Sequence, residues 1–222
     1  MAVLSPVMED YLKAIYHLQA ETDGRVATSA IAEHLGVTPP TVTSMLESLE
    51  ERDLVDREKY EGVRLTTAGE RVALEVIRHH RLLEAYLTEH LDFDWSEVHE
   101  EADRLEHHIS EALEARVAEA LADPEVDPHG SPIPGADLEP PTARPGTALL
   151  GHDPGTRVEV VQVPDEDPTV LEYLAAGGVE PGRTLTVEGI SPVGVVSVAT
   201  ADGEAVALSE EVAASIRVRP IG

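Results

Sequence analysis

Residues 28–50 read TSAIAEHLGVTPPTVTSMLESLE, and their pattern indicates how the N-terminal part of the chain folds. Thr28 can cap a short helix that stops at Gly36, and Thr38 can cap a second helix that two prolines open. Each helix carries apolar side chains at helical spacing. Two short helices joined by a tight turn are typical of a helix-turn-helix, a unit that reads DNA through its second helix.

The segments on either side complete a winged helix. Upstream, residues 5–22 place apolar side chains at helical spacing after a serine and a proline that suit a helix start. Downstream, residues 54–57 and 63–66 predict two short strands around a turn at residues 60–62. We therefore expect residues 1–66 to form a winged helix-turn-helix DNA-binding domain.

Three further parts follow along the chain. Residues 67–123 show helical spacing. One long helix runs to about His90, a second begins at Ser96, and a third ends at Leu121. Residues 124–146 are rich in proline and glycine and predict a linker. Within residues 147–222, strands are predicted at 158–163, 184–187, 194–198 and 216–218, and a short helix at 169–176. Because short strands need protected edges, we expect a small β-barrel and a fold that is mainly α with a small β domain.

The composition limits the functions that the chain can have. Its 222 residues are 42% hydrophobic, enough to bury a core in one or two domains. The chain has no cysteine, which excludes disulfides, thiolate metal ligands and a cysteine nucleophile. Met1–Asp10 has no basic start and no apolar run is long enough for a membrane span, so we expect a cytoplasmic protein with no membrane partner. The net charge of -27 taken alone argues against nucleic acid, and it indicates a solvated surface adapted to strong salt.

Side chains that ligate metals gather between residues 79 and 108. His80 and Glu84 are four residues apart on a predicted helix and therefore lie on one face. The next predicted helix carries four more within one stripe of about 100°, His99, Asp103, Glu106 and His107. That stripe on a surface helix is usually apolar, so these groups indicate a divalent metal held by oxygen and nitrogen, with a solvated acidic helix as the alternative. We expect His79 and His108 to be solvated.

Enzymatic chemistry lacks a motif in this chain. Residues 99–103, HEEAD, miss the second histidine of the H-E-x-x-H metalloprotease pattern because Asp103 stands in its place. The chain has no G-x-S-x-G elbow, no P-loop and no G-x-G-x-x-G fingerprint. We therefore expect a protein that is not an enzyme.

Four blocks of the sequence together resemble the diphtheria toxin repressor family of metal-dependent transcriptional regulators. These blocks are Met8–Tyr16, His80–Glu84, Val98–His107 and Gly130–Gly135. The resemblance implies a helical metal-binding and dimerisation domain at residues 67–123 and an SH3-like β-barrel at residues 147–222. It also implies a homodimer that binds a palindromic double-stranded DNA operator when metal is bound and represses metal-uptake genes. The alternative from another class is a metal-binding or storage module without operator specificity.

The resemblance further implies two metal sites in each subunit. The residues that match the first site are His80, Glu84 and His99, and those that match the second are Asp10, Asp103, Glu106 and His107. Arg81 matches a residue that holds an anion beside the first site in some members. The C-terminal domain can add ligands to the first site, and the residues in that neighbourhood are Gln162, Asp165, Glu166 and Asp167.

The donor set at the second site favours Mn(II) over Fe(II). Iron-type members place methionine and cysteine where this chain has Asp10 and Asp103, and an all-oxygen and imidazole set suits a harder ion. Two features favour the Fe(II) alternative. The barrel is commoner in iron-type members, and Lys13 stands where some manganese-type members carry a glutamate ligand.

Candidate DNA contacts lie on the second helix of the helix-turn-helix and around the hairpin. The candidates for base contact are Thr38, Pro40, Thr41, Thr43 and Ser44. The candidates for phosphate contact are Arg25, Arg57, Lys59 and Arg64. Each hydroxyl is also compatible with a helix cap or a solvated position. Each basic side chain is also compatible with an ordinary surface charge.

Overall fold

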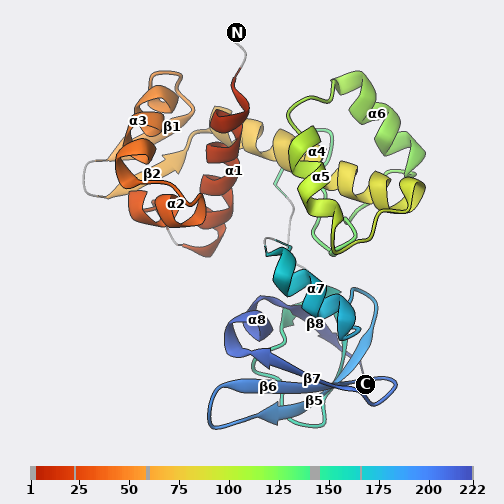
Figure 1. The fold of residues 1–222 in the computed structure, drawn as a ribbon. Helices are drawn as coiled ribbons and strands as arrows, with labels where there is room; N and C mark the ends of the chain where they lie inside the picture. Colours follow the sequence, from red (N-terminus) through yellow and green to blue (C-terminus); the bar gives the residue numbers. More distant parts are fainter. Residues whose placement is uncertain (1–3, 23, 59–60, 141–145, 166, 222) are drawn as a thin grey trace. The chain divides into compact units, whose positions relative to one another are not determined.

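The computed structural model describes residues 4–22, 24–58, 61–140, 146–165 and 167–221 (Figure 1). The chain forms two compact units. The first comprises Met1–His79, Glu106–His108 and Pro134–Pro140, and the second comprises His80–Leu105, Ile109–Ile133 and Pro141–Gly222. The proposed domain boundaries at residues 66, 123 and 146 stay a prediction.

The first unit contains the predicted winged helix-turn-helix. Its elements are α1 (Pro6–Glu21), α2 (Thr28–His34), α3 (Pro39–Glu50), β1 (Val55–Glu58) and β2 (Gly62–Leu65). Helix α1 begins after Ser5, whose hydroxyl accepts a hydrogen bond from the Met8 amide. Two caps differ from expectation: Ala27 precedes α2, with Thr28 already its first residue, and Thr38 precedes α3 but makes no side-chain capping hydrogen bond.

The core of this unit joins the three helices to the hairpin. The fully buried side chains Leu12, Ile31 and Leu46 come from α1, α2 and α3 in turn. Val26 and Val63 exchange both backbone hydrogen bonds, at 2.7 and 3.0 Å, and so tie the segment before α2 to strand β2. The hairpin is therefore held as a wing at a defined place beside the helices.

Helix α4 (Thr67–Leu91) begins in the first unit and continues from His80 into the second, which also contains α5 (Val98–Leu105) and α6 (Glu111–Ala120). Helix α5 ends at Leu105, so Glu106 and His107 lie beyond it, and the prediction of one helical stripe is wrong. The Glu106 carbonyl oxygen lies 3.1 Å from Nδ1 of His79 instead of continuing the helix. His79 is accordingly buried, contrary to expectation, whereas His108 is exposed as predicted.

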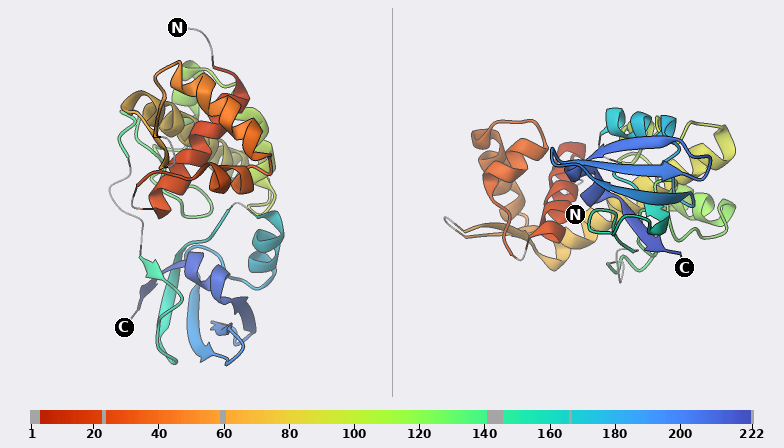
Figure 2. Two further views of the ribbon diagram at one scale, coloured as in Figure 1. Left: turned by 90° about the vertical axis from the view of Figure 1, so that its left-hand side faces the viewer. Right: turned by 90° about the horizontal axis from the view of Figure 1, so that it is seen from below.

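The C-terminal part of the second unit is a six-stranded antiparallel sheet in the order β3-β8-β4-β5-β6-β7 (Figures 1 and 2). Its elements are β3 (Thr147–Ala148), β4 (Arg157–Gln162), α7 (Pro168–Ala176), β5 (Thr184–Ile190), β6 (Val195–Thr200), β7 (Ala205–Ser209), α8 (Glu210–Ser215) and β8 (Arg217–Pro220). The four predicted strands and the helix α7 are confirmed, and β3, β7 and α8 are additions. No strand pairing joins β7 to β3 among the described residues, so the expected barrel is open.

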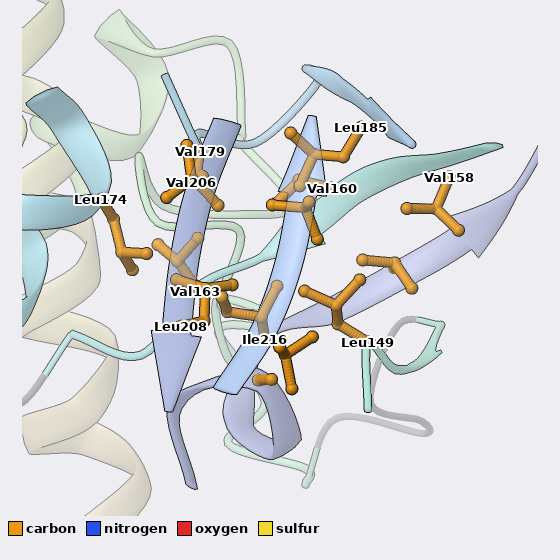
Figure 3. Close-up of a cluster of buried hydrophobic side chains, with 14 of the residues drawn as sticks. Leu149, Val158, Val160, Val163, Leu174, Val179, Leu185, Val206, Leu208 and Ile216 are labelled. Carbon is orange, nitrogen blue, oxygen red and sulfur yellow. The ribbon is translucent and has the colours of Figure 1, made fainter. Parts of the chain in front are cut away.

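Branched aliphatic side chains from the sheet and α7 form the core of this part (Figure 3). Val160, Leu174 and Leu185 are completely buried in this cluster and come from β4, α7 and β5 in turn. Trp95, which precedes α5, packs against the same cluster. Among the helices of the described residues, none has the length and apolar character needed to cross a membrane.

Candidate metal centres and DNA-binding face

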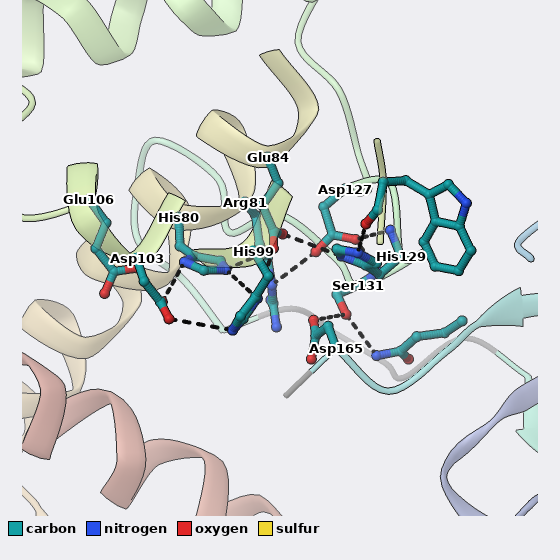
Figure 4. A network of polar contacts seen from close by, with 12 residues as sticks. His80, Arg81, Glu84, His99, Asp103, Glu106, Asp127, His129, Ser131 and Asp165 are labelled. Carbon is teal, nitrogen blue, oxygen red and sulfur yellow. Dashed lines mark hydrogen bonds and ion pairs between the residues drawn. The ribbon is translucent and has the colours of Figure 1, made fainter. Parts of the chain in front are cut away.

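Helices α4 and α5 bring together the three residues that match the first metal site (Figure 4). Oε1 of Glu84 lies 2.9 Å from Nε2 of His80 and 3.0 Å from Nδ1 of His99. The same two ring nitrogens are 3.1 Å apart. One carboxylate oxygen and two imidazole nitrogens therefore converge at one point, as the resemblance implies for a metal site.

Asp103 lies beside the same two histidines. Its Oδ1 is 3.2 Å from Nδ1 of His80, and its Oδ2 is 3.6 Å from Nε2 of His99. Its side chain is half-exposed, in contrast to the buried Glu84. His80, His99 and Asp103 thus form a group with metal-ligand spacing, and the assignment of Asp103 to the second site stays a prediction.

A further group of ligand-type residues was not predicted. Glu84, Asp127 and His129 offer ligand atoms within 4.8 Å of one another and are all buried. Oε2 of Glu84, Oδ2 of Asp127 and Nδ1 of His129 have no hydrogen-bond partner in the described part of the chain. Their charged contacts are long, 3.6 Å between Oε2 of Glu84 and Nδ1 of His129 and 3.5 Å from Oδ2 of Asp127 to Nε of Arg81. Buried polar atoms without hydrogen bonds are costly, and a bound cation would satisfy all three. The donor set therefore fits a divalent metal.

The surroundings of this group fix which atoms face inward. Nε2 of His129 lies 2.7 Å from the Trp95 carbonyl oxygen, which only an N–H can satisfy, so Nε2 carries a proton and Nδ1 is the ligand atom. Oδ1 of Asp127 accepts hydrogen bonds from the amides of His129 and Ser131, at 2.8 and 2.9 Å. Oδ2 of Asp127 is thereby left as the ligand atom of that carboxylate.

The electrostatics of this metal-free group favour protons on Asp127 and His129 but leave Glu84 charged. Burial raises the pKa of Asp127 to about 7, and the charges of Glu84 and Asp165 add to the rise. Burial opposes the charged form of His129, but attraction to Glu84 and Asp127 outweighs it and raises its pKa to about 9. Burial alone would raise the pKa of Glu84, yet the neighbouring histidines hold it well below its usual value.

The other candidate residues for the first site differ in what they contact. The Nε of Arg81 lies 3.5 Å from Oδ2 of Asp127, and its role in anion binding stays a prediction. Ser131 donates a hydrogen bond to Asp165 at 3.3 Å and accepts one from Gln162 at 3.0 Å, so both candidates reach the Asp127 loop. Asp167 instead caps α7, and Glu166 lies outside the described residues.

Three residues that match the second metal site also meet, within the first unit. Nε2 of His107 lies 2.9 Å from Oδ1 of Asp10 and 3.4 Å from Oε1 of Glu106. The three form a group with metal-ligand spacing. Burial raises the pKa of Asp10, partly offset by His107. Asp10 belongs to α1, so a metal here would join that helix to the segment after α5.

Two neighbours support this centre: Glu9 was missed from sequence, and Lys13 was noted only as standing where some manganese-type members carry a glutamate ligand. Oε2 of Glu9 lies 2.7 Å from Nδ1 of His107 and so holds the ring with Nε2 toward Asp10. Nζ of Lys13 donates a hydrogen bond to Oε2 of Glu106 at 2.8 Å. Both residues stand on α1 near Asp10, which was the available signal, but their partners lie more than 90 residues away.

The predicted base-contacting residues stand at the start of α3. Four of them are exposed, Thr38, Pro40, Thr41 and Ser44, and Thr43 is half-buried. The hydroxyls of Thr38 and Thr41 share a hydrogen bond of 2.9 Å, and Thr43 donates to the Pro39 carbonyl at 3.0 Å. Their role at bases stays a prediction.

The predicted phosphate-contacting arginines all have acidic partners. Arg25 and Arg64 both contact Asp56, and Arg57 lies 3.4 Å from Glu50. Lys59 lies outside the described residues. Their role at phosphates stays a prediction.

A winged helix combined with buried clusters of carboxylates and imidazoles defines a metal-dependent DNA-binding protein, and comparison with known proteins agrees. Residues 3–63 match the family model of the iron dependent repressor N-terminal DNA binding domain. Residues 66–135 match the model of the iron dependent repressor metal binding and dimerisation domain, and residues 147–220 match the FeoA domain. The chain is 35% identical to the iron-dependent repressor IdeR of Mycobacterium leprae, over 96% of both chains. It is 34% identical to the diphtheria toxin repressor of Corynebacterium efficiens, over 100% of this chain and 98% of that protein.

Solved structures show the same likeness. A manganese-dependent transcriptional repressor in complex with manganese has a TM-score of 0.85 and 38% identity, over 96% of this chain and 100% of that chain. The manganese regulator SloR has a TM-score of 0.82 and 32% identity, over 98% and 100%. The chain belongs to the diphtheria toxin repressor family, whose members are DNA-binding, metal-dependent transcriptional repressors and not enzymes. The DNA-binding and dimerisation domains of the family indicate DNA and a second copy of the chain as partners.

Proposed function

We propose that the chain is an Mn(II)-activated repressor that acts as a homodimer in the cytoplasm on a palindromic operator and lowers the expression of metal-uptake genes. The observation that carries this proposal is the chemistry of the ligand clusters. The described clusters offer carboxylate and imidazole donors, and the chain has no cysteine to supply a thiolate. Oxygen-rich donor sets favour Mn(II), whereas softer sulfur ligands favour other metals.

Two centres would hold the metal. At the first, Glu84 is common to the pair His80 and His99 and to the pair Asp127 and His129, so it is the central ligand. At the second, Asp10, Glu106 and His107 form the ligand set, with Asp103 added on the strength of the resemblance.

The second centre is the switch in this proposal. Asp10 of α1 and His107 would hold a metal there together, and α1 packs in one core with α2 of the helix-turn-helix. Because α1 shares a core with α2, a metal that holds α1 in place would also hold the helix-turn-helix in place. Thr38, Pro40, Thr41, Thr43 and Ser44 would then meet bases, and Arg25, Arg57, Lys59 and Arg64 would meet phosphates.

Variants at the second centre test the proposal. His107→Ala should abolish metal-dependent binding to the upstream DNA of the gene, while His108→Ala, which changes an exposed neighbouring histidine, should leave it intact. Fluorescence anisotropy with chelator and with Mn(II) measures both. Operator binding by His107→Ala that equals the unaltered chain, or binding that ignores chelator, would contradict the switch.

Two alternatives give different results in the same assay. A metal-binding or storage module would bind Mn(II) but would not distinguish upstream DNA from a scrambled duplex. An Fe(II)-dependent regulator, the activity named for IdeR, would respond to Fe(II) at lower free concentration than to Mn(II).

A further inference from the structure

Strand pairing in the wing places an acidic side chain directly opposite a basic one. Asp56 on β1 is the register partner of Arg64 on β2. Side chains of directly opposed residues share a face of the ribbon. Both Nε and Nη2 of Arg64 lie 2.9 Å from Oδ2 of Asp56. Arg64 therefore binds one oxygen of this carboxylate with two nitrogens.

A second guanidinium reaches the same oxygen from another segment. Nη2 of Arg25 lies 2.9 Å from Oδ2 of Asp56, and the backbone bridge between Val26 and Val63 fixes where Arg25 starts. The Asp56 side chain is 43% exposed and that of Arg64 59%, whereas that of Arg25 is 15% exposed, so the cluster faces solvent on its Asp56 and Arg64 side with Arg25 beneath. Two arginines that converge on a single anionic oxygen form the arrangement that binds a phosphate oxygen.

From this geometry we infer that Arg25 and Arg64 form a DNA phosphate site that Asp56 occupies in the free protein, so that Asp56 competes with the DNA backbone. The inference rests on the proposed function, in which the wing meets DNA. A phosphate must displace the carboxylate, and the displaced carboxylate stays close enough to repel it. The cost applies to every DNA sequence equally, because backbone contacts carry no sequence information. Asp56 thus weakens non-specific binding and leaves base contacts to select the operator.

Neighbouring charges support this role for Asp56. Oε2 of Glu58, on the same face of β1, lies 3.1 Å from Nη2 of Arg25, so a second carboxylate adds to the repulsion. Hydrogen bonds from Arg25 and Arg64 hold the pKa of Asp56 below its usual value, so Asp56 is charged at neutral pH. Arg57 alternates to the other face and pairs with Glu50 of α3, so it lies outside this cluster.

The exchange predicts a distinctive salt dependence. Binding to DNA releases counterions, with a slope of log affinity against log salt of about 0.9 for each phosphate neutralised. Arginines already neutralised by Asp56 contribute little to that slope. Removal of the Asp56 charge should therefore steepen the slope by about 1, the contribution of the one phosphate that the two arginines hold together.

The test compares Asp56→Asn with the unaltered full-length chain, using anisotropy on upstream DNA and on a scrambled duplex at several salt concentrations with saturating Mn(II). Asp202→Asn is the matched control, because it removes the same charge at an exposed turn between β6 and β7. We expect Asp56→Asn to tighten binding to the scrambled duplex by about tenfold and to steepen the salt slope, and Asp202→Asn to do neither. Asp56→Glu, which keeps the charge, should resemble the unaltered chain.

Opposite results separate this inference from the proposed function. Weaker or unchanged binding of the scrambled duplex by Asp56→Asn would overturn the inference, since Asp56 would then position the arginines rather than compete for them. Equal tightening by Asp202→Asn would also overturn it, because net charge alone would then explain the effect. Absence of operator binding by the unaltered chain with Mn(II) and with Fe(II) would overturn the proposed function as well.

Discussion

Glu84 joins two pairs of ligand residues, so its replacement by glutamine is the sharpest perturbation of the first metal centre. Oε1 of Glu84 faces His80 and His99 at 2.9 and 3.0 Å, and Oε2 lies 3.6 Å from Nδ1 of His129. Glutamine keeps the shape of the side chain but loses the charge and turns one of the two ligand oxygens into a donor. The substitution therefore affects both pairs at once.

The size of the effect follows from the position of the side chain. Glu84 is fully buried, so water cannot replace the missing oxygen easily. Changing even an outer partner of a metal ligand costs about 10- to 100-fold in affinity, and Glu84 is itself a ligand in this account. We expect a loss of at least about 100-fold, or about 2.8 kcal/mol at about 1.4 kcal/mol for each factor of ten.

The chain carries its own reporter for this centre. It has one tryptophan, Trp95, whose carbonyl oxygen lies 2.7 Å from Nε2 of His129 and whose ring centre is 5.6 Å from that of His129. Paramagnetic Mn(II) at the centre should quench the Trp95 emission. Titration of the metal-free chain with Mn(II) then gives the affinity of the first centre directly.

Matched variants make the outcome decisive. The quenching midpoint of Glu84→Gln should move to at least about 100-fold higher Mn(II), while Asp10→Asn, at the second centre, should keep the midpoint of the unaltered chain. An unchanged midpoint in Glu84→Gln, with the variant folded by circular dichroism, would refute the assignment of Glu84 as the shared ligand.

Two further predictions concern protons and the support of ligands. Glu9→Gln should weaken Mn(II) binding at the second centre by about 10- to 100-fold, because Glu9 orients the His107 ring; isothermal titration measures this, and unchanged affinity would contradict it. At the first centre, the folded metal-free chain holds extra protons, on Asp127 between its ordinary pKa of 3.8 and about 7 and on His129 between 6.5 and about 9. The stability that protonated His129 contributes is thus complete below pH 6.5 and disappears as pH rises through about 9. The melting temperature of the unaltered chain should therefore fall over that interval, and it should fall less in His129→Gln. For the same reason Mn(II) binding followed by Trp95 should strengthen with pH and release protons, and a pH-independent affinity would contradict the ligand assignment.

Local sequence patterns predicted most of the fold. The apolar spacing of α1 to α4 and the two short strands of the wing are local properties, and the structure has these elements where the sequence predicts them. Strand β7 was missed because Ala205–Ser209 is short and carries only alanine and serine at its exposed positions, and pairing with β6 orders it. The end of α5 at Leu105 was missed because the turn at Glu106 depends on His79, 27 residues earlier.

The candidate site was only partly predictable for the same reason. His80 and Glu84 share a helical face, which spacing alone reveals. Asp127 and His129 lie in a proline- and glycine-rich loop more than 40 residues after Glu84. No helical or strand spacing relates this loop to Glu84, so the sequence does not show that the three residues meet. Two ligand-type residues in one loop were the available signal, and only the tertiary fold shows that they face a buried carboxylate.

Metal-switched DNA recognition is the central claim, and one measurement addresses it most directly. Under anaerobic conditions, anisotropy of labelled upstream DNA and of a scrambled duplex is followed with chelator, with Mn(II) and with Fe(II), at several salt concentrations. The account predicts no specific binding with chelator and restored specific binding at lower free Mn(II) than free Fe(II). Specific binding that persists with chelator would contradict the switch, and a stronger response to Fe(II) would contradict the choice of manganese.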